Sequence, residues 1–231
     1  MDDLTLIIPA KNEKESLPLV LNELKSLNLK IIIILEKTDV ETINSIKNYD
    51  CRILFQENKG YGDALIQGIN NVQTKYFCIF NADGSFNPKE LKEMHQKLYI
   101  ENFDIVFASR YDKGCSSDDD TIITLVGNFI FTKIGNIFFN LEITDILYTF
   151  VMGDVNKVKK LSLTNKDFVF CVELPIKSKR NGLKISTAVS NERARFAGVK
   201  KVNAFKDGFL ILLGMIRLMV NRPLNPSIRF A

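Results

Sequence analysis

The sequence predicts an α/β fold, a mostly parallel sheet with helices on both of its faces. The first observation is a repeated alternation of short apolar runs and amphipathic stretches over residues 4–110. The second is composition: 46% hydrophobic and 25% charged residues in a chain of 231 provide a large core without a bias toward disorder. A chain of this length suits one compact domain. In such a sheet, ligands bind at the carboxyl ends of the strands.

Each predicted strand is a short, continuous apolar run of the kind found in buried parallel strands. These runs cover residues 4–9, 31–35, 52–55, 76–80 and 104–109. Apolar residues at helical spacing predict the helices between them, and Pro88 suits the first turn of the last one. These helices cover residues 13–27, 40–47, 61–72 and 88–99. The alternation implies right-handed crossovers and a sheet covered on both faces.

After residue 110 the alternation stops. A polar, acidic loop, DKGCSSDDD (112–120), leads into an aromatic-rich helix predicted at 122–139. Two interpretations of this helix stay open: a core helix under the sheet, or an amphipathic helix that lies in a membrane interface. Helices at 168–179 and 202–220 and a strand at 184–189 follow, and the last helix has a wide apolar face. The sequence therefore predicts amphipathic helices toward the C-terminus.

Charge is distributed unevenly along the chain. Residues 1–150 contain 15 Lys and Arg against 22 Asp and Glu, a net charge of −7. Residues 151–231 contain 16 against 5, a net charge of +11. A basic surface attracts anions, so nucleic acid, an anionic membrane and a phosphate-bearing substrate are all candidate partners.

Residue types exclude several classes of site. A Ser-His-Asp triad or a His-rich metal site is not expected, because His95 is the single histidine. The four cysteines lie far apart, which favours reduced thiols over disulfides or zinc. The apolar stretch at 209–220 is shorter than the roughly 20 residues that span a bilayer, and the acidic N-terminus is unlike a signal peptide. We therefore expect a cytoplasmic protein without a transmembrane anchor.

A group of oxygen-bearing side chains follows the fourth predicted strand. Asn81, Asp83 and Ser85 stand at alternate positions, so their side chains are expected on one side. Oxygen ligands suit a hard divalent cation, Mg²⁺ or Mn²⁺. The alternative is a structural Asx turn ahead of the Pro88 helix.

Two further motifs lie at predicted strand ends. Pro9, Asn12 and Glu13 follow the first strand, where Glu13 would also stabilise a helix N-terminus. Gly60 and Gly62 precede a helix, where backbone N–H groups can approach a phosphate or the glycines can simply form a turn. Both motifs are therefore candidates for binding an anionic ligand.

Cations occupy two other places of interest. Arg110 ends the fifth strand, and an arginine there can bind phosphate bidentately. Arg193, Arg195, Lys200 and Lys201 follow the last predicted strand, and they form either a solvated face or a phosphate-binding loop.

Taken in order along the chain, seven segments resemble the family 2 inverting glycosyltransferases, and within them the polyprenol-phosphate mannose and glucose synthases. These segments are PAKNE (9–13), ENKGYGDALIQGI (57–69), NADGSFNP (81–88), SRY (109–111), ITD (143–145), FCVEL (170–174) and ERARFAGVKK (192–201). The resemblance covers nearly the whole chain. It implies a single Rossmann-like GT-A domain over residues 1–231, with a nucleotide-sugar-binding half at 1–110 and an acceptor-binding, membrane-facing half at 111–231.

The resemblance also implies a role for each matched residue. The expected donor-binding residues are Pro9, Ala10, Asn12, Glu13, Glu36, Lys59, Gly60, Asp63, Asn81, Ala82 and Arg110. The expected catalytic residues are Asp83, Glu173, Asp145 and Arg195, with Asp145 and Glu173 as candidate bases for a hydroxyl acceptor. Arg193, Lys200 and Lys201 would contact the diphosphate or the acceptor, and Asp83, Asn81 and Ser85 would hold Mg²⁺ or Mn²⁺.

The chain departs from the family pattern at three of these places. Asn81 stands where the family has the first aspartate of its D-x-D element, and Lys200 stands where its basic loop has a serine. Glu36, in LEKTD, is the one candidate for the carboxylate that contacts the nucleotide base. These departures leave the identity of the donor open.

The resemblance implies an inverting transfer from a nucleotide sugar to a polyprenyl phosphate at the cytoplasmic face of the membrane. Transfer to a glycan or small-molecule hydroxyl is the alternative acceptor chemistry. A catalytically weak homologue that binds a nucleotide sugar or a membrane-protein partner is the rival from another class. Nucleic acid is not an expected partner under any of these readings, and membrane association would be peripheral.

Overall fold

The computed structural model describes residues 1–198 and 203–221. Its main sheet has seven strands in the order β3-β2-β1-β4-β7-β5-β8, and two further short strands, β6 and β9, pair with each other. The strands are β1 (Leu4–Pro9), β2 (Lys30–Leu35), β3 (Arg52–Phe55), β4 (Tyr76–Ile79), β5 (Ile105–Ser109), β6 (Ser116–Ser117), β7 (Val151–Asp154), β8 (Ile185–Val189) and β9 (Asn191–Glu192). The predicted α/β fold is confirmed, and the second half of the chain adds two strands to the sheet that the first half begins.

The helices connect these strands as expected for an α/β protein. They are α1 (Leu17–Leu24), α2 (Val40–Ile46), α3 (Tyr61–Asn71), α4 (Leu91–Tyr99), α5 (Ile122–Phe139), α6 (Val155–Lys159), α7 (Phe170–Arg180) and α8 (Ala204–Val220). Two 3₁₀ turns, Lys25–Leu27 and Pro88–Glu90, extend α1 and precede α4.

The sheet is parallel except at β7, which runs antiparallel between β4 and β5. The sequence prediction missed this strand. Gly153 lets β7 fit there, since a Cβ at this position would come within 3.1 Å of the Phe77 ring. Because β7 separates β4 from β5, it spreads the carboxyl ends of these two strands apart.

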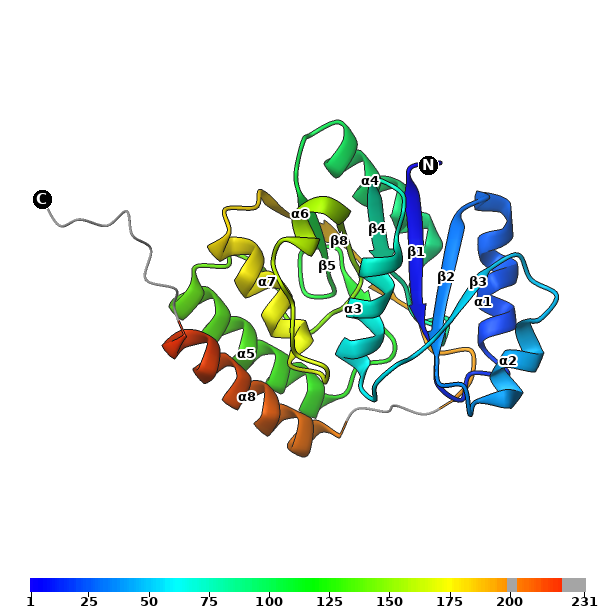
Figure 1. The fold of residues 1–231 in the computed structure, drawn as a ribbon. Coiled ribbons are helices and arrows are strands. Elements are labelled where there is room, and N and C mark those ends of the chain that lie inside the picture. The colour runs from blue at the N-terminus through cyan, green and yellow to red at the C-terminus, as the bar shows by residue number, and fades with distance from the viewer. Residues whose placement is uncertain (199–202, 222–231) are drawn as a thin grey trace, which may run out of the picture.

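The core consists of three apolar clusters, and the helices that form them lie on both faces of the sheet (Figure 1). Helices α1, α2 and α4 cover one face of the sheet, and α3, α6 and α7 cover the other. Outside α7, helices α5 and α8 lie side by side and enclose a third apolar cluster that includes Val172, Ile211 and Met215. The outermost layer is therefore a pair of helices that packs on one side only.

Two sequence predictions about helices were wrong. The first helix was predicted over 13–27 but begins at Leu17, because Pro18 belongs in a first turn and residues 12 and 13 instead donate their N–H groups to Asp39 and Thr42. The interpretation of 122–139 as a core helix is also wrong, since only 17% of α5 is buried.

Helix α5 also changes the expectation about membrane spans. It is 18 residues long with a mean hydropathy of 1.6, enough by length and composition to cross a membrane. The expectation drawn from residues 209–220 overlooked this helix, whose Thr, Asn and Lys residues interrupt its apolar run.

Candidate active site

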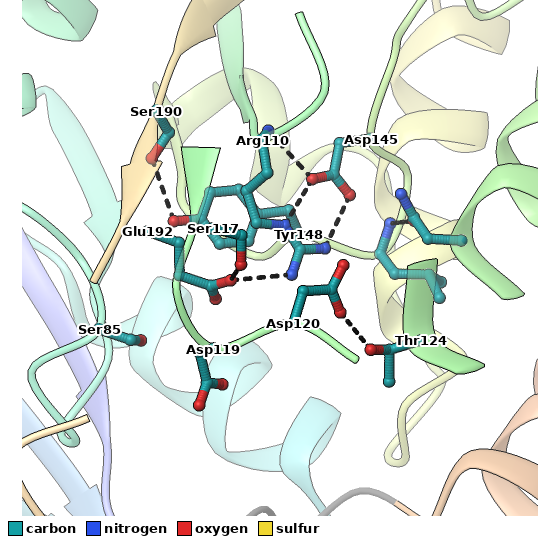
Figure 2. Close-up of polar contacts among 12 residues, drawn as sticks. Ser85, Arg110, Ser117, Asp119, Asp120, Thr124, Asp145, Tyr148, Ser190 and Glu192 are labelled. Carbon is teal, nitrogen blue, oxygen red and sulfur yellow. Dashed lines mark hydrogen bonds and ion pairs between the residues drawn. The ribbon is translucent and has the colours of Figure 1, made fainter. Parts of the chain in front are cut away.

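Charged side chains from distant parts of the sequence meet at the carboxyl edge of the sheet (Figure 2). The structure gathers four of the predicted residues there, Asp83, Arg110, Asp145 and Arg195. It adds three carboxylates that the sequence prediction did not select: Asp119, Asp120 and Glu192. Ser85 lies beside them. This edge is therefore the candidate site.

Asp83 is held in the turn that follows β4. Its Oδ1 accepts hydrogen bonds from the backbone N–H of Ser85 at 3.0 Å and from the Ser85 hydroxyl at 2.8 Å. The Asn81 amide donates to the same hydroxyl at 3.2 Å. The predicted Asx-turn alternative is thus correct for the local geometry. Asp83 Oδ2 points to a cation instead, because Arg195 Nη1 lies 3.2 Å away.

Arg195 joins this turn to the acidic loop. Its Nε and Nη2 form a bidentate pair with the Asp119 carboxylate at 2.9–3.1 Å. The remaining nitrogen, Nη1, is the one that faces Asp83. Burial disfavours the charged guanidinium, but Asp119 and Asp83 raise the pKa of Arg195, so it remains protonated. One cation thus neutralises two carboxylates from segments 36 residues apart.

The segment that carries Arg195 crosses the sheet edge from the Asp83 turn toward β1. The backbone N–H groups of Arg193 and Phe196 donate to the carbonyls of Ser85 and Asp83. The Phe196 ring lies against Gly84, where a Cβ would come within 2.4 Å of it, and Gly84 has φ +85°. Gly198 follows beside the Glu13 carboxylate. Residues 193–198 therefore span the predicted metal and donor positions.

Arg110 forms a second, more deeply buried cluster. Its Nε and Nη2 contact the Asp145 carboxylate at 2.7 and 3.1 Å, and its Nη1 donates to Glu192 Oε2 at 3.2 Å. The guanidinium stacks on the Tyr148 ring at 4.4 Å. Burial opposes the charge, yet the two carboxylates raise the pKa of Arg110. Because its donors are already bound within the protein, Arg110 holds the site together rather than offering a free phosphate contact.

Helix α5 positions the segment that carries Asp145. Three polar side chains, four residues apart on its buried side, bond to the chain at 143–147. Asn128 accepts from the N–H of Leu147, Thr132 accepts from that of Ile146, and Asn136 bonds to both backbone groups of Ile143. Residues at this spacing share one face of a helix. The inner face of α5 therefore combines these polar contacts with Phe131, Ile134 and Phe139, which pack in the third apolar cluster.

The first turn of α5 belongs to the site itself. Asp120 accepts hydrogen bonds from the hydroxyls of Thr124 and Tyr111, the residue after Arg110. Burial opposes ionisation of Asp120, but these hydrogen bonds and Arg110 lower its pKa. A capping box between Thr121 and Thr124 fixes the start of the helix. The N-terminus of α5 is thereby tied to the arginine clusters.

The outer face of α5 is apolar and exposed. Its exposed apolar residues are Ile122, Ile123, Leu125, Val126, Phe129, Ile130, Ile137 and Phe138. Neighbouring α8 adds Phe205, Phe209, Leu212, Ile216, Met219 and Val220. We call these fourteen residues the α5–α8 apolar face. An exposed apolar patch of this kind marks a surface that contacts another apolar phase.

The donor-binding predictions at β1 and β2 fall on adjacent strand ends. Lys11 and Glu36 form an exposed ion pair at 3.0 Å, and Asn12 has a left-handed backbone with φ 52°. Glu13 is buried and accepts a hydrogen bond from Ser16. Pro9 ends β1, while the side chains of Ala10 and Ala82 are buried in the core, so only their backbone faces the edge.

The predicted glycine site is occupied by the protein chain. A Cβ on Gly60 would lie 2.0 Å from the Lys166 carbonyl oxygen, and one on Gly62 would lie 2.3 Å from that of Asn165. Asp63 pairs with Lys166 and accepts hydrogen bonds from Asn58, while Lys59 is exposed. The glycines therefore serve close packing against residues 165–167, which corrects the expectation that their N–H groups face a phosphate.

Glu173 and Arg193 also have structural partners. The fully buried Glu173 carboxylate accepts from the backbone N–H groups of Thr164 and Asn165 and pairs with Lys177 at 2.7 Å. Burial opposes ionisation, but these contacts lower the pKa of Glu173, which makes it a poor base and corrects its predicted role. Arg193 pairs with Glu23 and donates to the Phe86 carbonyl. Lys200 and Lys201 lie outside the described residues.

The charge balance of the site indicates what it can bind. Among the residues that the structure describes, Asp83, Asp119, Asp145 and Glu192 face two arginines in a partly buried setting. The described residues form no group of three or more His, Cys, Asp or Glu that could hold a metal by themselves. A Mg²⁺ or Mn²⁺ held by one carboxylate and by substrate phosphates fits this donor set, with Asp83 and Asn81 as its protein ligands.

Comparison with known proteins identifies the family. The family Glycosyl transferase family 2 matches residues 5–162, which include β1, the Asp83 turn and Asp145. The chain belongs to glycosyl transferase family 2. It is 23% identical over 228 residues to an uncharacterized protein of Methanocaldococcus jannaschii, covering 93% of both chains. It is 27% identical over 97 residues to an uncharacterized glycosyltransferase of Mycobacterium tuberculosis, covering 42% of this chain and 44% of the relative.

Solved structures of sugar-transferring synthases share the fold. Glucosyl-3-phosphoglycerate synthase from Mycobacterium tuberculosis, in complex with UDP, superimposes with a TM-score of 0.75 at 13% identity, covering 94% of this chain and 80% of that one. Mannosyl-3-phosphoglycerate synthase from Rubrobacter xylanophilus gives a TM-score of 0.72 at 13% identity, covering 97% and 78%. These likenesses support a GT-A-like fold for this glycosyltransferase.

We predict that removing the carboxylate of Asp145 destabilises the fold. Asp145→Ala leaves the buried Arg110 without its bidentate partner, which should lower the free energy of unfolding by about 3–5 kcal/mol. Urea unfolding measures this loss. Glu41→Ala, which breaks the exposed Lys14–Glu41 pair, is the matched control and should cost far less. Equal losses in the two variants would contradict the role assigned to the Arg110 cluster.

Proposed function

We propose that this glycosyltransferase moves a sugar, with inversion, from a nucleotide-sugar donor to a polyprenyl phosphate at the cytoplasmic face of a membrane. One observation carries the proposal. Helix α5 begins at Ile122, directly after Asp120 of the charged site, and presents an exposed apolar face along its length. A lipid lying along that face would bring its phosphate to the site.

The donor would bind across the carboxyl ends of β1, β2 and β4, in the half formed by residues 1–110. Pro9, Asn12 and Glu36 lie where a nucleoside would sit, and Asp83 and Arg195 lie where its diphosphate would follow. Supporting this assignment, the glucosyl-3-phosphoglycerate synthase of similar fold has been solved with Mn²⁺ and UDP-glucose.

A divalent cation on Asp83 and Asn81 would neutralise the diphosphate as the sugar leaves. Arg195 would then release Asp83 Oδ2 and contact the phosphates through the same nitrogen, Nη1. Asp119 would keep the guanidinium in place through its bidentate pair. Stabilisation of the leaving diphosphate is therefore assigned to Arg195 together with the cation.

Membrane association would be peripheral and reversible. Two neighbouring helices supply the α5–α8 apolar face, and the last 81 residues add a net charge of +11. Polar side chains on the inner face of α5 are bonded to residues 143–147, so α5 would lie in the interface without leaving the fold. An apolar face plus basic residues gives adsorption that weakens as salt screens the charge.

A water-soluble acceptor is the second candidate. The glucosyl-3-phosphoglycerate synthase of similar fold has been solved with phosphoglyceric acid, which is not a lipid. Transfer to a glycan or small-molecule hydroxyl would then use the same donor site. Assays with polyprenyl phosphate in vesicles and with soluble hydroxyl acceptors separate the two. Donor binding without any transfer would favour a catalytically weak homologue.

We predict that Asp83→Ala abolishes transfer and removes the stabilisation of the protein by Mn²⁺ with UDP, because it removes the one carboxylate proposed to bind the cation. Thermal shift with UDP, with and without Mn²⁺, and transfer assays measure the two effects. Asn81→Asp, which adds a carboxylate, should retain or strengthen the Mn²⁺ effect. Unchanged turnover in Asp83→Ala would contradict the assignment of Asp83 as a metal ligand.

We predict that the protein binds anionic vesicles at low salt and releases them at high salt. Phe129 and Ile137 are 60% and 72% exposed, so changing both to Ser should reduce flotation with vesicles several-fold. The matched control changes Tyr99 and Ile100 to Ser. These two residues lie at and just after the end of α4, away from α5 and α8, and are about as exposed as Phe129 and Ile137. A protein that stays soluble at both salt concentrations, or an equal loss in the control, would contradict the membrane surface.

A further inference from the structure

Transfer to a hydroxyl, the second acceptor class proposed, leaves one chemical task without a residue, whereas a fully ionised phosphate needs no base. An attacking oxygen that still carries a proton must lose it as the new bond forms. The sequence suggested Asp145 and Glu173, but Asp145 is paired bidentately with Arg110, and Glu173 is held by Lys177 and two backbone N–H groups. Both carboxylates are committed to cations, so neither is placed to accept a proton.

Glu192 has the geometry that these two lack. It ends β9 and is 6% exposed. Its Oε2 accepts from the Ser117 hydroxyl and from Arg110 Nη1. In the part of the chain that the structure describes, no partner is found for Oε1, and this oxygen is not sealed from solvent. One oxygen therefore orients the carboxylate and the other can accept a proton.

The surroundings of Glu192 favour proton uptake. Arg110 pairs with both Asp145 and Glu192, so its single positive charge does not balance the negative charges of the two carboxylates. Burial raises the pKa of Glu192, and the Asp119 carboxylate raises it further. The Arg110 charge and the Ser117 hydrogen bond oppose this rise. The charged or titratable groups that act on Glu192 are Arg110 at the end of β5, Asp119 in the acidic loop, Tyr148 beneath Arg110 and Arg195 in the 193–198 segment. A carboxylate whose pKa is raised by burial and by a neighbouring carboxylate, and which also has a specific cation partner, is typical of a functional site.

We infer that Glu192 is a catalytic residue, whose Oε1 receives the proton of the acceptor's attacking oxygen. In the step, the acceptor oxygen forms its bond to the anomeric carbon while its proton passes to Oε1. The bond from that carbon to the diphosphate oxygen breaks, and its electron pair leaves with the diphosphate. The proton returns to solvent after the products leave.

The inference rests on the proposed function and narrows its substrate class. The attacking oxygen must carry a proton when bound, as a hydroxyl does. A phosphate monoester also qualifies in its singly ionised form, because its second pKa is about 6 and neighbouring carboxylates raise it. The neighbouring carboxylates in this site are those of Asp119 and Asp120. Water meets the same requirement, so hydrolysis of the donor uses the same group.

The test compares wild type with Glu192→Gln, which keeps an oxygen for the Ser117 and Arg110 hydrogen bonds but cannot take the proton. We expect kcat for donor hydrolysis and for transfer to fall by about 100-fold or more, with UDP and Mn²⁺ affinity unchanged. Glu192→Asp should recover part of the rate. Glu142→Gln, whose carboxylate pairs with Lys179 instead, is the control and should keep the wild-type rate.

The pH dependence gives the second readout. Activity of wild type should fall as pH drops through the raised pKa of Glu192, because the ionised form is the one that accepts the proton. Glu192→Gln should lose this acid limb. A kcat within threefold of wild type, or an acid limb that persists, would overturn the assignment. Failure of wild type with polyprenyl phosphate would instead reject that acceptor, while hydrolysis would still decide the role of Glu192.

Discussion

The site depends on one buried interaction, the pairing of Arg110 with Asp145 above the Tyr148 ring. It joins the end of β5 to the segment after α5, and through Glu192 it reaches β9. A buried cation with two carboxylates is costly unless every contact is kept. The fold keeps them by bonding residues 143–147 to α5 and by stacking the guanidinium on an aromatic ring. Arg110 thereby fixes the positions of the groups around it.

Helix α5 explains how a charged site and an apolar surface come to lie together. Its inner face bonds to the chain through Asn128, Thr132 and Asn136, whereas its outer face is apolar and exposed. In a protein surrounded only by water the outer face of such a helix is expected to be polar. The apolar outer face fits a helix that meets lipid on this side while its first turn contacts the reacting groups. Arg195 completes the site from the other side, through Asp119 and Asp83.

The fold was largely predictable because its strands are local apolar runs such as LTLIIP and KIIIIL. Strand β7 was missed because VMGD is short and pairs only through distant neighbours. Of the site, Asp83, Asp145, Arg110 and Arg195 were found from strand ends and family motifs. Asp119 and Glu192 were not, since their partners lie 76 and 82 residues away, although the DDD run and a glutamate just past a strand were visible signals. The prediction that Gly60 and Gly62 approach a phosphate was wrong, because their close contact with residues 165–167 depends on tertiary packing.

We propose that the nucleotide diphosphate and its cation bind at the carboxyl edge of the sheet, between the Asp83 turn and residues 193–198. Hydrogen exchange of the backbone, measured with and without UDP and Mn²⁺, tests it most directly. On binding, we expect slower exchange at residues 81–86, at 193–198 and in the acidic loop around Asp119, with little change in α4 and β3. Protection confined to other surfaces, or none at saturating UDP and Mn²⁺, would contradict it.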